Sequence, residues 1–250
     1  MSYPVRFFTI LLGVLMTATL TFASATTSDN PFGDKDIAFM VQQQLAEGKI
    51  VKTGALGVSV AQGVVTLRGT VPHVWARDRA VKLAMEVAGV QAIESELDIA
   101  FEESDKKLGE NVAKEIRRYV FFTIYDDVNI GVEEGSVTLT GRVTWPFKAT
   151  EIAERVSRVL GVQELRSEIQ VLPVNTHDSR LRRVLAFRIY RDPLFVGLGN
   201  QVNPPIHIVV ERGRVTLTGA VRSKVEKRKA EIIARSTFGV FSVENRLTVG

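Results

Sequence analysis

Hydrophobic positions along the chain follow a helical spacing that occurs three times. In each case an aspartate is followed by apolar residues three, seven and eleven positions later, starting from Asp34, Asp105 and Asp178. This spacing places the apolar side chains on one side of a helix, and aspartate is a favoured N-cap residue. The pattern therefore predicts three helices with these aspartates as N-caps. Their apolar residues are Ile37, Val41 and Leu45; Leu108, Val112 and Ile116; and Leu181, Leu185 and Ile189.

Two segments with alternating apolar residues follow each of these helices. The second segment carries the sequence G-x-V-T-L-x-G-x-V, which begins at Gly63, Gly135 and Gly213. A glycine in a two-residue connection between strands supplies the positive φ that a tight hairpin turn requires. Each repeat is therefore predicted to contain a β-hairpin.

A second helix and a third strand are predicted to complete each repeat. The helices cover residues 76–88, 148–160 and 224–238, and each precedes a Gly-Val pair. Glycine is common at the position that ends a helix. The third strands then cover residues 90–99, 162–171 and 240–249. The glycines that define the three repeats are Gly63, Gly69, Gly89, Gly135, Gly141, Gly161, Gly213, Gly219 and Gly239.

The predicted fold class is α+β, with three tandem units of helix, strand, strand, helix and strand. The units cover residues 34–100, 105–172 and 178–249. Three strands form one small sheet per unit, and both helices are expected on the same face of it, because a sheet this small buries a single apolar face.

The first 25 residues are predicted to lie outside these units. A basic residue, Arg6, precedes an uncharged apolar stretch that ends in Ala23, Ser24 and Ala25. This order is typical of a cleaved secretory signal peptide at residues 1–25, with a retained N-terminal anchor as the alternative. A cleaved signal would place the protein in the periplasm.

The order of elements, the G-x-V-T-L-x-G-x-V sequence and the later Gly-Val pair resemble the BON-domain family in three tandem copies. The family is named for osmotically induced and nodulation-related bacterial proteins. The resemblance implies a periplasmic or envelope protein without known catalysis. It also implies association with phospholipid surfaces and with envelope stress, including osmotic stress.

Reactive residues do not recur among the three repeats. The histidines His73, His177 and His207 have no counterparts in the other repeats, and His177 is expected in a linker. The acidic pairs Asp126-Asp127 and Glu133-Glu134 lack the spacing of a calcium loop. The absence of cysteine excludes disulfides, thiolate zinc sites and cysteine nucleophiles. We therefore expect a protein that is not an enzyme and has no catalytic residues, metal or cofactor.

Charge separates the third repeat from the other two. The chain carries 32 basic and 28 acidic residues, a net charge of +4. Residues 34–103 have a net charge of −3 and residues 104–177 of −1, whereas residues 178–250 reach +8. This concentration favours an anionic partner. Nucleic acid is not expected as that partner in the periplasm.

The third repeat also contains a longer connection, residues 191–205, with several large apolar residues. One interpretation is a loop that dips into a membrane while arginines bind lipid phosphates, each contributing about 1 kcal/mol. The alternative is a loop that folds back over the core. The predicted lipid-binding residues are Arg180, Arg183, Arg188, Arg191, Leu194, Phe195, Val196 and Leu198.

The sequence thus predicts a non-enzymatic periplasmic envelope protein, peripheral on a membrane. Its third repeat is expected to bind anionic phospholipid and thereby to support envelope integrity or stress tolerance. The alternative function is a protein interaction or assembly module, with other envelope proteins or a second copy as partner, or a holdase-like periplasmic chaperone.

Overall fold

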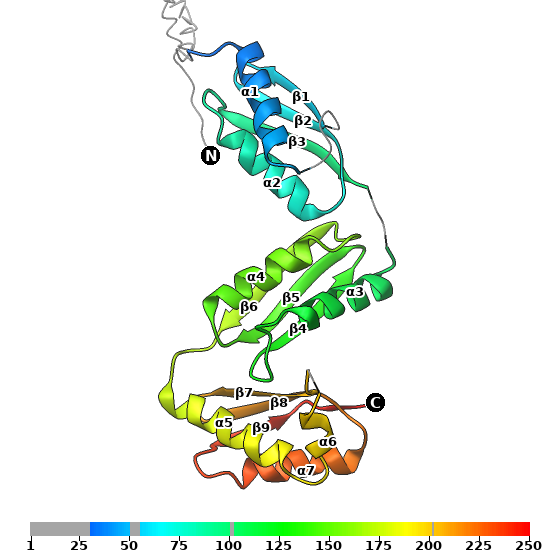
Figure 1. Cartoon of the computed structure of the whole chain (residues 1–250), viewed down its shortest axis with the longest axis vertical. Coiled ribbons are helices and arrows are strands. Elements are labelled where there is room, and N and C mark those ends of the chain that lie inside the picture. Colours follow the sequence, from blue (N-terminus) through cyan, green and yellow to red (C-terminus); the bar gives the residue numbers. More distant parts are fainter. Residues whose placement is uncertain (1–30, 51–55, 101–102, 202) are drawn as a thin grey trace, which may run out of the picture. The chain divides into compact units, whose positions relative to one another are not determined.

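A computed structural model describes residues 31–50, 56–100, 103–201 and 203–250, and these form three units of similar architecture (Figure 1). The predicted signal peptide at residues 1–25 lies outside the described residues. The first unit comprises α1 (Asp34–Glu47), β1 (Leu56–Ala61), β2 (Val64–Val71), α2 (Val74–Met85) and β3 (Ala92–Ile99). The second comprises α3 (Asp105–Arg118), β4 (Asp127–Glu133), β5 (Ser136–Val143), α4 (Pro146–Ser157) and β6 (Glu164–Val171).

The third unit has the same order of elements with two additions. It comprises α5 (Thr176–Tyr190), the short α6 (Val196–Gly199), β7 (Ile206–Glu211), β8 (Arg214–Val221), α7 (Lys224–Arg235), β9 (Ser242–Asn245) and β10 (Thr248–Val249). Its third strand was predicted as one continuous segment, which is wrong, because it is divided into β9 and β10. At the break, the Asn245 side chain donates to the carbonyl of Lys227, and Leu247 is buried in the core.

Each unit is a two-layer α+β structure, which confirms the predicted fold class. The first two strands pair antiparallel as a hairpin, and the third pairs parallel to the second, giving the sheet orders β1-β2-β3 and β4-β5-β6. In the third unit, β7, β9 and β10 all pair with β8. The two long helices of each unit pack against each other and contact the strands.

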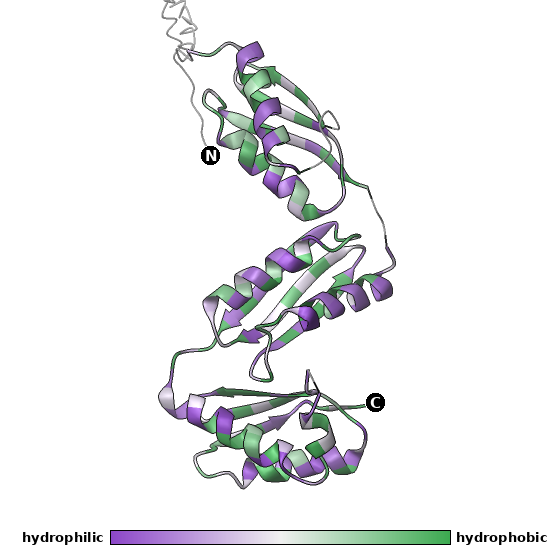
Figure 2. Cartoon of the chain, in the orientation of Figure 1, coloured by the Kyte–Doolittle hydropathy of each residue, from purple (hydrophilic) through white to green (hydrophobic). Residues whose placement is uncertain are grey.

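Each unit has its own hydrophobic core between its helices and its sheet. The apolar residues predicted on the first helix of each repeat are all buried, so the helical spacing was interpreted correctly. The helices alternate between hydrophilic and hydrophobic residues, as Figure 2 shows. The cores of the first and third units are each built from residues of one repeat, so the repeat is also a unit of packing.

The predicted role of the repeated aspartate as an N-cap is wrong. The N-caps are Gly33, Ser104 and Asn175, which precede the aspartates. Asp34 instead accepts hydrogen bonds from the backbone N–H groups of two hairpin-turn residues, Gln62 at 2.9 Å and Gly63 at 3.0 Å. A carboxylate satisfies both donors at once because the two N–H groups point to the same side of the turn.

The same contact occurs in the other two units. Asp105 accepts from the N–H groups of Glu134 and Gly135, both at 3.0 Å. Asp178 accepts from Arg212 at 2.7 Å and from Gly213 at 2.8 Å. We call this contact the aspartate clamp; it joins the start of the first helix to a turn 28 to 35 residues later.

Glycines of each repeat have positive φ both in the hairpin turn and before the third strand. Both hairpin-turn residues have positive φ, for example 50° at Arg212 and 73° at Gly213, as the predicted two-residue turn requires. Gly89, Gly161 and Gly239 also have positive φ, but they do not end the helices as predicted. The helices end four residues before these glycines, at Met85, Ser157 and Arg235. Each glycine occupies the third position of a β-turn that leads into the next strand.

Candidate functional site

The three histidines occupy separate places in the fold. His73 is the N-cap of α2 and accepts from the N–H of Ala76 at 3.2 Å through Nδ1. His177 lies in the first turn of α5, so its predicted place in a linker is wrong. His207 lies within β7, as predicted. His177 and His207 both belong to the third unit, but they lie on different elements, α5 and β7, and have different hydrogen-bond partners, Gly239 and Asp126.

The His73 cap predicts a pH dependence of the first unit. Burial lowers the pKa of His73, so the folded unit favours the neutral ring that accepts from Ala76. The stability from this cap is therefore present above pH 6.5 and is lost as the pH falls below that value. We expect a loss of about 1 kcal/mol in the protection of the Ala76 amide, measured by hydrogen exchange. In a His73→Asn variant, whose cap does not titrate, protection should stay constant; equal pH dependence in both proteins would contradict the prediction.

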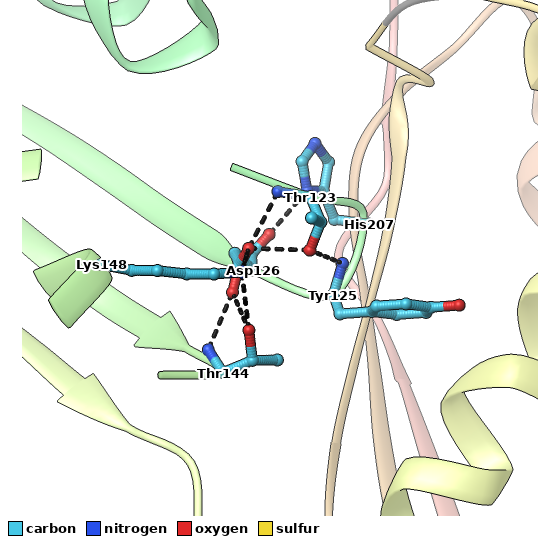
Figure 3. Close-up of polar contacts among 6 residues, drawn as sticks. All are labelled: Thr123, Tyr125, Asp126, Thr144, Lys148 and His207. Atoms are coloured by element: carbon cyan, nitrogen blue, oxygen red, sulfur yellow. Dashed lines mark hydrogen bonds and ion pairs between the residues drawn. The ribbon is translucent and has the colours of Figure 1, made fainter. Parts of the chain in front are cut away.

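A buried ion pair lies inside the second unit (Figure 3). The Asp126 carboxylate accepts from Lys148 Nζ at 2.7 Å, and both side chains are almost completely buried. It also accepts from the N–H and hydroxyl groups of Thr123 and Thr144. Every strong acceptor site of Asp126 is thus occupied by the protein itself, which identifies a structural network.

The acidic residues do not form a cation site. Asp126 is committed to the buried network, and Asp127 and Glu133 lie at opposite ends of β4. Among the described residues, no group of three His, Cys, Asp or Glu side chains could hold a metal ion.

A groove of about 800 Å³ runs between α3 and α4 of the second unit. Basic and acidic side chains alternate along it, and Arg155 pairs with Glu115 at 3.2 Å while Arg158 pairs with Glu154 at 2.6 Å. Serine, threonine and histidine are absent from its described lining. The groove therefore lacks the hydroxyl nucleophile and imidazole base of a Ser-His pair.

The basic residues predicted on the first helix of the third unit form one exposed face of α5. Arg180, Arg183, Arg188 and Arg191 are all exposed, and Phe187 lies among them. Arg180, Arg183, Phe187 and Arg191 follow the spacing that shares one side of a helix. The Arg188 guanidinium instead donates to the carbonyl oxygen of Ser236 at 3.0 Å and to the Thr237 hydroxyl at 2.7 Å, at the end of α7. We call this surface the α5 face. Arg191 stacks over the Phe187 ring at 4.6 Å, which leaves the guanidinium edge available to an anion.

The apolar residues of residues 191–205 divide into two groups. Phe195 and Leu198 are buried in the core of the third unit, whereas Leu194 and Val196 are exposed. The alternative interpretation, a loop folded over the core, is therefore correct for the first two. Phe195 and Leu198 are not accessible to lipid, because α6 turns them inward.

The second basic helix of the third unit, α7, is partly neutralised by ion pairs. Lys229 pairs with Asp192 at 3.2 Å, and Arg235 pairs with Glu231 at 2.8 Å. By contrast, Arg180 and Arg183 on the α5 face form no ion pair in the described part of the chain. Lys224, Lys227 and Arg228 of α7 also form no ion pair among the described residues, so both helices contribute to the positive charge of the third unit.

Sequence reasoning did not identify two exposed aromatic residues. Phe238 and Phe241 are 99% and 79% exposed, in the turn between α7 and β9. The first was included in a predicted helix, which in fact ends at Arg235. Alignment of the three repeats on their glycines would have detected the difference, because the equivalent residues of the other two repeats are not aromatic.

No helix among the described residues combines the length and the apolar composition needed to cross a bilayer. A comparison with curated proteins gives no significant match. Among the solved structures that are similar to this chain, two are of CdsD, a structural protein of the type III secretion system of Chlamydia trachomatis. The C-terminal domain is 12% identical, with 88% of this chain and 100% of that chain covered, and the second structure is 13% identical, with 86% and 92% covered. Both have a TM-score of 0.24, too low to inform the function.

The family comparison agrees with the repeat pattern. The BON domain model matches residues 33–100, 104–173 and 196–250. The third match begins after α5, so the α5 face lies before the matched segment. The matches together cover most of the sequence, and each contains the hairpin with its glycines. The chain therefore belongs to the BON-domain family, in three tandem copies.

Proposed function

We propose that the protein binds anionic phospholipid surfaces of the bacterial envelope through its third unit, without catalysing a reaction. The observation that carries this proposal is the α5 face, with four exposed arginines in the one unit whose net charge is +8. The only carboxylate on α5 is Asp178, which is buried in the aspartate clamp. Nothing on this helix therefore opposes the attraction of a phosphate.

The chemistry of the α5 face suits lipid headgroups. An arginine presents several N–H donors in a plane and binds phosphate oxygens in pairs. Phe187, exposed by 59% between the arginines, can enter the boundary between headgroups and acyl chains. Protein held at the membrane in this way would support envelope integrity under stress.

Vesicle co-sedimentation of the full chain tests the proposal. We expect pelleting with vesicles that contain phosphatidylglycerol, weak pelleting with phosphatidylcholine alone, and a strong reduction at 0.5 M salt because the charges are exposed. Two arginines near the surface contribute about 2 kcal/mol together, so Arg180→Gln/Arg183→Gln should weaken binding roughly thirtyfold.

The matched control is Arg117→Gln/Arg118→Gln, which removes two exposed arginines from α3 in the second unit. It should bind nearly as the unmodified protein does. Equal binding to neutral and anionic vesicles, or equal weakening by both double substitutions, would contradict a site in the third unit.

A further inference from the structure

The turn between α7 and β9 exposes two large aromatic side chains at one end of the third unit. Phe238 is 99% exposed and Phe241 is 79% exposed, and Gly239 between them has a φ of +90°. An aromatic ring this exposed contacts almost no other part of its own unit. Water contact with both rings is unfavourable, so this end of the unit favours an apolar environment.

This turn is held firmly by the surrounding elements. The Phe241 N–H donates to the carbonyl of Gly213 at 2.8 Å, which joins it to the β7-β8 hairpin. His177 Nε2 lies 3.4 Å from the carbonyl oxygen of Gly239, which joins it to the start of α5. The aspartate clamp fixes the same hairpin to α5. The two rings are therefore presented on a fixed backbone.

Two exposed arginines lie on the backbone next to this turn. Arg212 is exposed in the hairpin turn, and Arg214 is exposed at the start of β8, opposite Ser242, the residue that follows Phe241. Neither arginine forms an ion pair in the described part of the chain. The nearby carboxylates are those of Asp178, which is buried in the clamp, Glu211, which is partly buried, and Glu244, which pairs with Arg246 at 2.7 Å.

The equivalent end of the second unit has a different chemistry, although the clamp and the glycines are the same. Glu134 and Ser136 stand where the third unit has its two arginines, and Leu160 and Gln163 stand where it has its two phenylalanines. In the first unit these positions are occupied by Gln62, Val64, Ala88 and Gln91. Four positions at this end thus carry arginine or phenylalanine in the third unit, and residues that are neither basic nor aromatic in the other two.

We infer that residues 238–241 form a membrane-inserting turn, in which Phe238 and Phe241 enter the acyl boundary of an anionic bilayer while Arg212 and Arg214 bind lipid phosphates. This inference rests on the proposed function and gives it a second contact, separate from the α5 face. The combination of aromatic rings and unpaired arginines matches a bilayer whose acyl chains are apolar and whose headgroups are anionic.

The first test is vesicle binding by Phe238→Ser/Phe241→Ser in the full chain. Full burial of one phenylalanine strengthens binding by about ten- to a hundredfold, so the double substitution should weaken binding to vesicles with phosphatidylglycerol at least tenfold. The control is Phe39→Ser, which removes an exposed phenylalanine from α1 in the first unit and should leave binding unchanged. Circular dichroism should show both variants folded, because the replaced side chains are exposed.

The second test measures insertion directly. The chain has no cysteine, so Phe238→Cys supplies a single thiol for an environment-sensitive NBD dye. Anionic vesicles should shift its emission to the blue, and spin-labelled lipids should quench it. A dye at Ala88→Cys, the equivalent exposed position in the first unit, should show neither effect.

The two proposals fail in different ways. If the unmodified protein binds anionic vesicles but Phe238→Ser/Phe241→Ser binds equally well and the dye at residue 238 stays in water, the inserting turn is refuted and the proposed function stands. If the unmodified protein does not bind anionic vesicles, the proposed function itself is refuted, and the turn with it.

Discussion

Replacement of Lys148 by methionine is expected to destabilise the second unit by about 3–5 kcal/mol. The substitution keeps an unbranched side chain one atom shorter than lysine, and it leaves the Asp126 carboxylate buried without its cation. Removal of one partner from a buried pair has a cost of this size because the remaining charge is desolvated and uncompensated. Hydrogen exchange of β5 amides measures the change within the second unit.

Two further variants separate charge from packing. Asp126→Asn/Lys148→Met removes the charge together with its partner and should recover part of the loss. Lys114→Met removes an exposed lysine from α3 of the same unit and should change stability by less than about 0.5 kcal/mol. If Lys148→Met were no more harmful than Lys114→Met, the ion pair would be dispensable.

Replacement of Gly219 by alanine is expected to destabilise the third unit by 3 kcal/mol or more, roughly the sum of two effects. Gly219 has a φ of +102°, which costs a residue with a side chain about 1–3 kcal/mol. An added Cβ would also overlap the carbonyl oxygen of Pro205 in the backbone before β7. Backbone cannot move aside without losing pairing between β7 and β8, so the loss exceeds that from strain alone.

Gly197→Ala is the matched control for this prediction. Gly197 lies in α6 of the same unit, and an added Cβ there would meet no atom within 4 Å. Its replacement should be neutral or slightly stabilising, since alanine favours a helix. Hydrogen exchange of β8 amides measures the stability of the third unit in the two variants. An equal loss of protection in both would argue against a steric role for Gly219.

Most of the fold could be predicted because it depends on local signals that repeat three times. The spacing of Ile37, Val41 and Leu45 identified a helix side that is indeed buried. The role of Asp34 was predicted wrongly for a physical reason. An aspartate at a helix start is usually a local cap, and its true partners, two hairpin N–H groups, lie 28 and 29 residues away. Sequence spacing carries no information on which distant N–H groups a carboxylate will reach.

The candidate site was predicted only in part. The exposed arginines of the α5 face follow from helical spacing, whereas the burial of Phe195 and Leu198 depends on α6, a helix too short to have a periodic signal. The Asp126–Lys148 pair was also hidden, because a lysine in a charged helix normally faces water. Phe238 was missed because apolar residues near a helix end are usually assigned to the core.

The aspartate clamp has a consequence for how the three units diverge. It binds only the main-chain N–H groups of the hairpin turn, so it places no demand on the side chain there, which is glutamine at 62, glutamate at 134 and arginine at 212. Evolution can therefore exchange the charge at this tip without loss of the scaffold. One repeat can therefore change its surface charge at the hairpin turn while the other two repeats keep theirs.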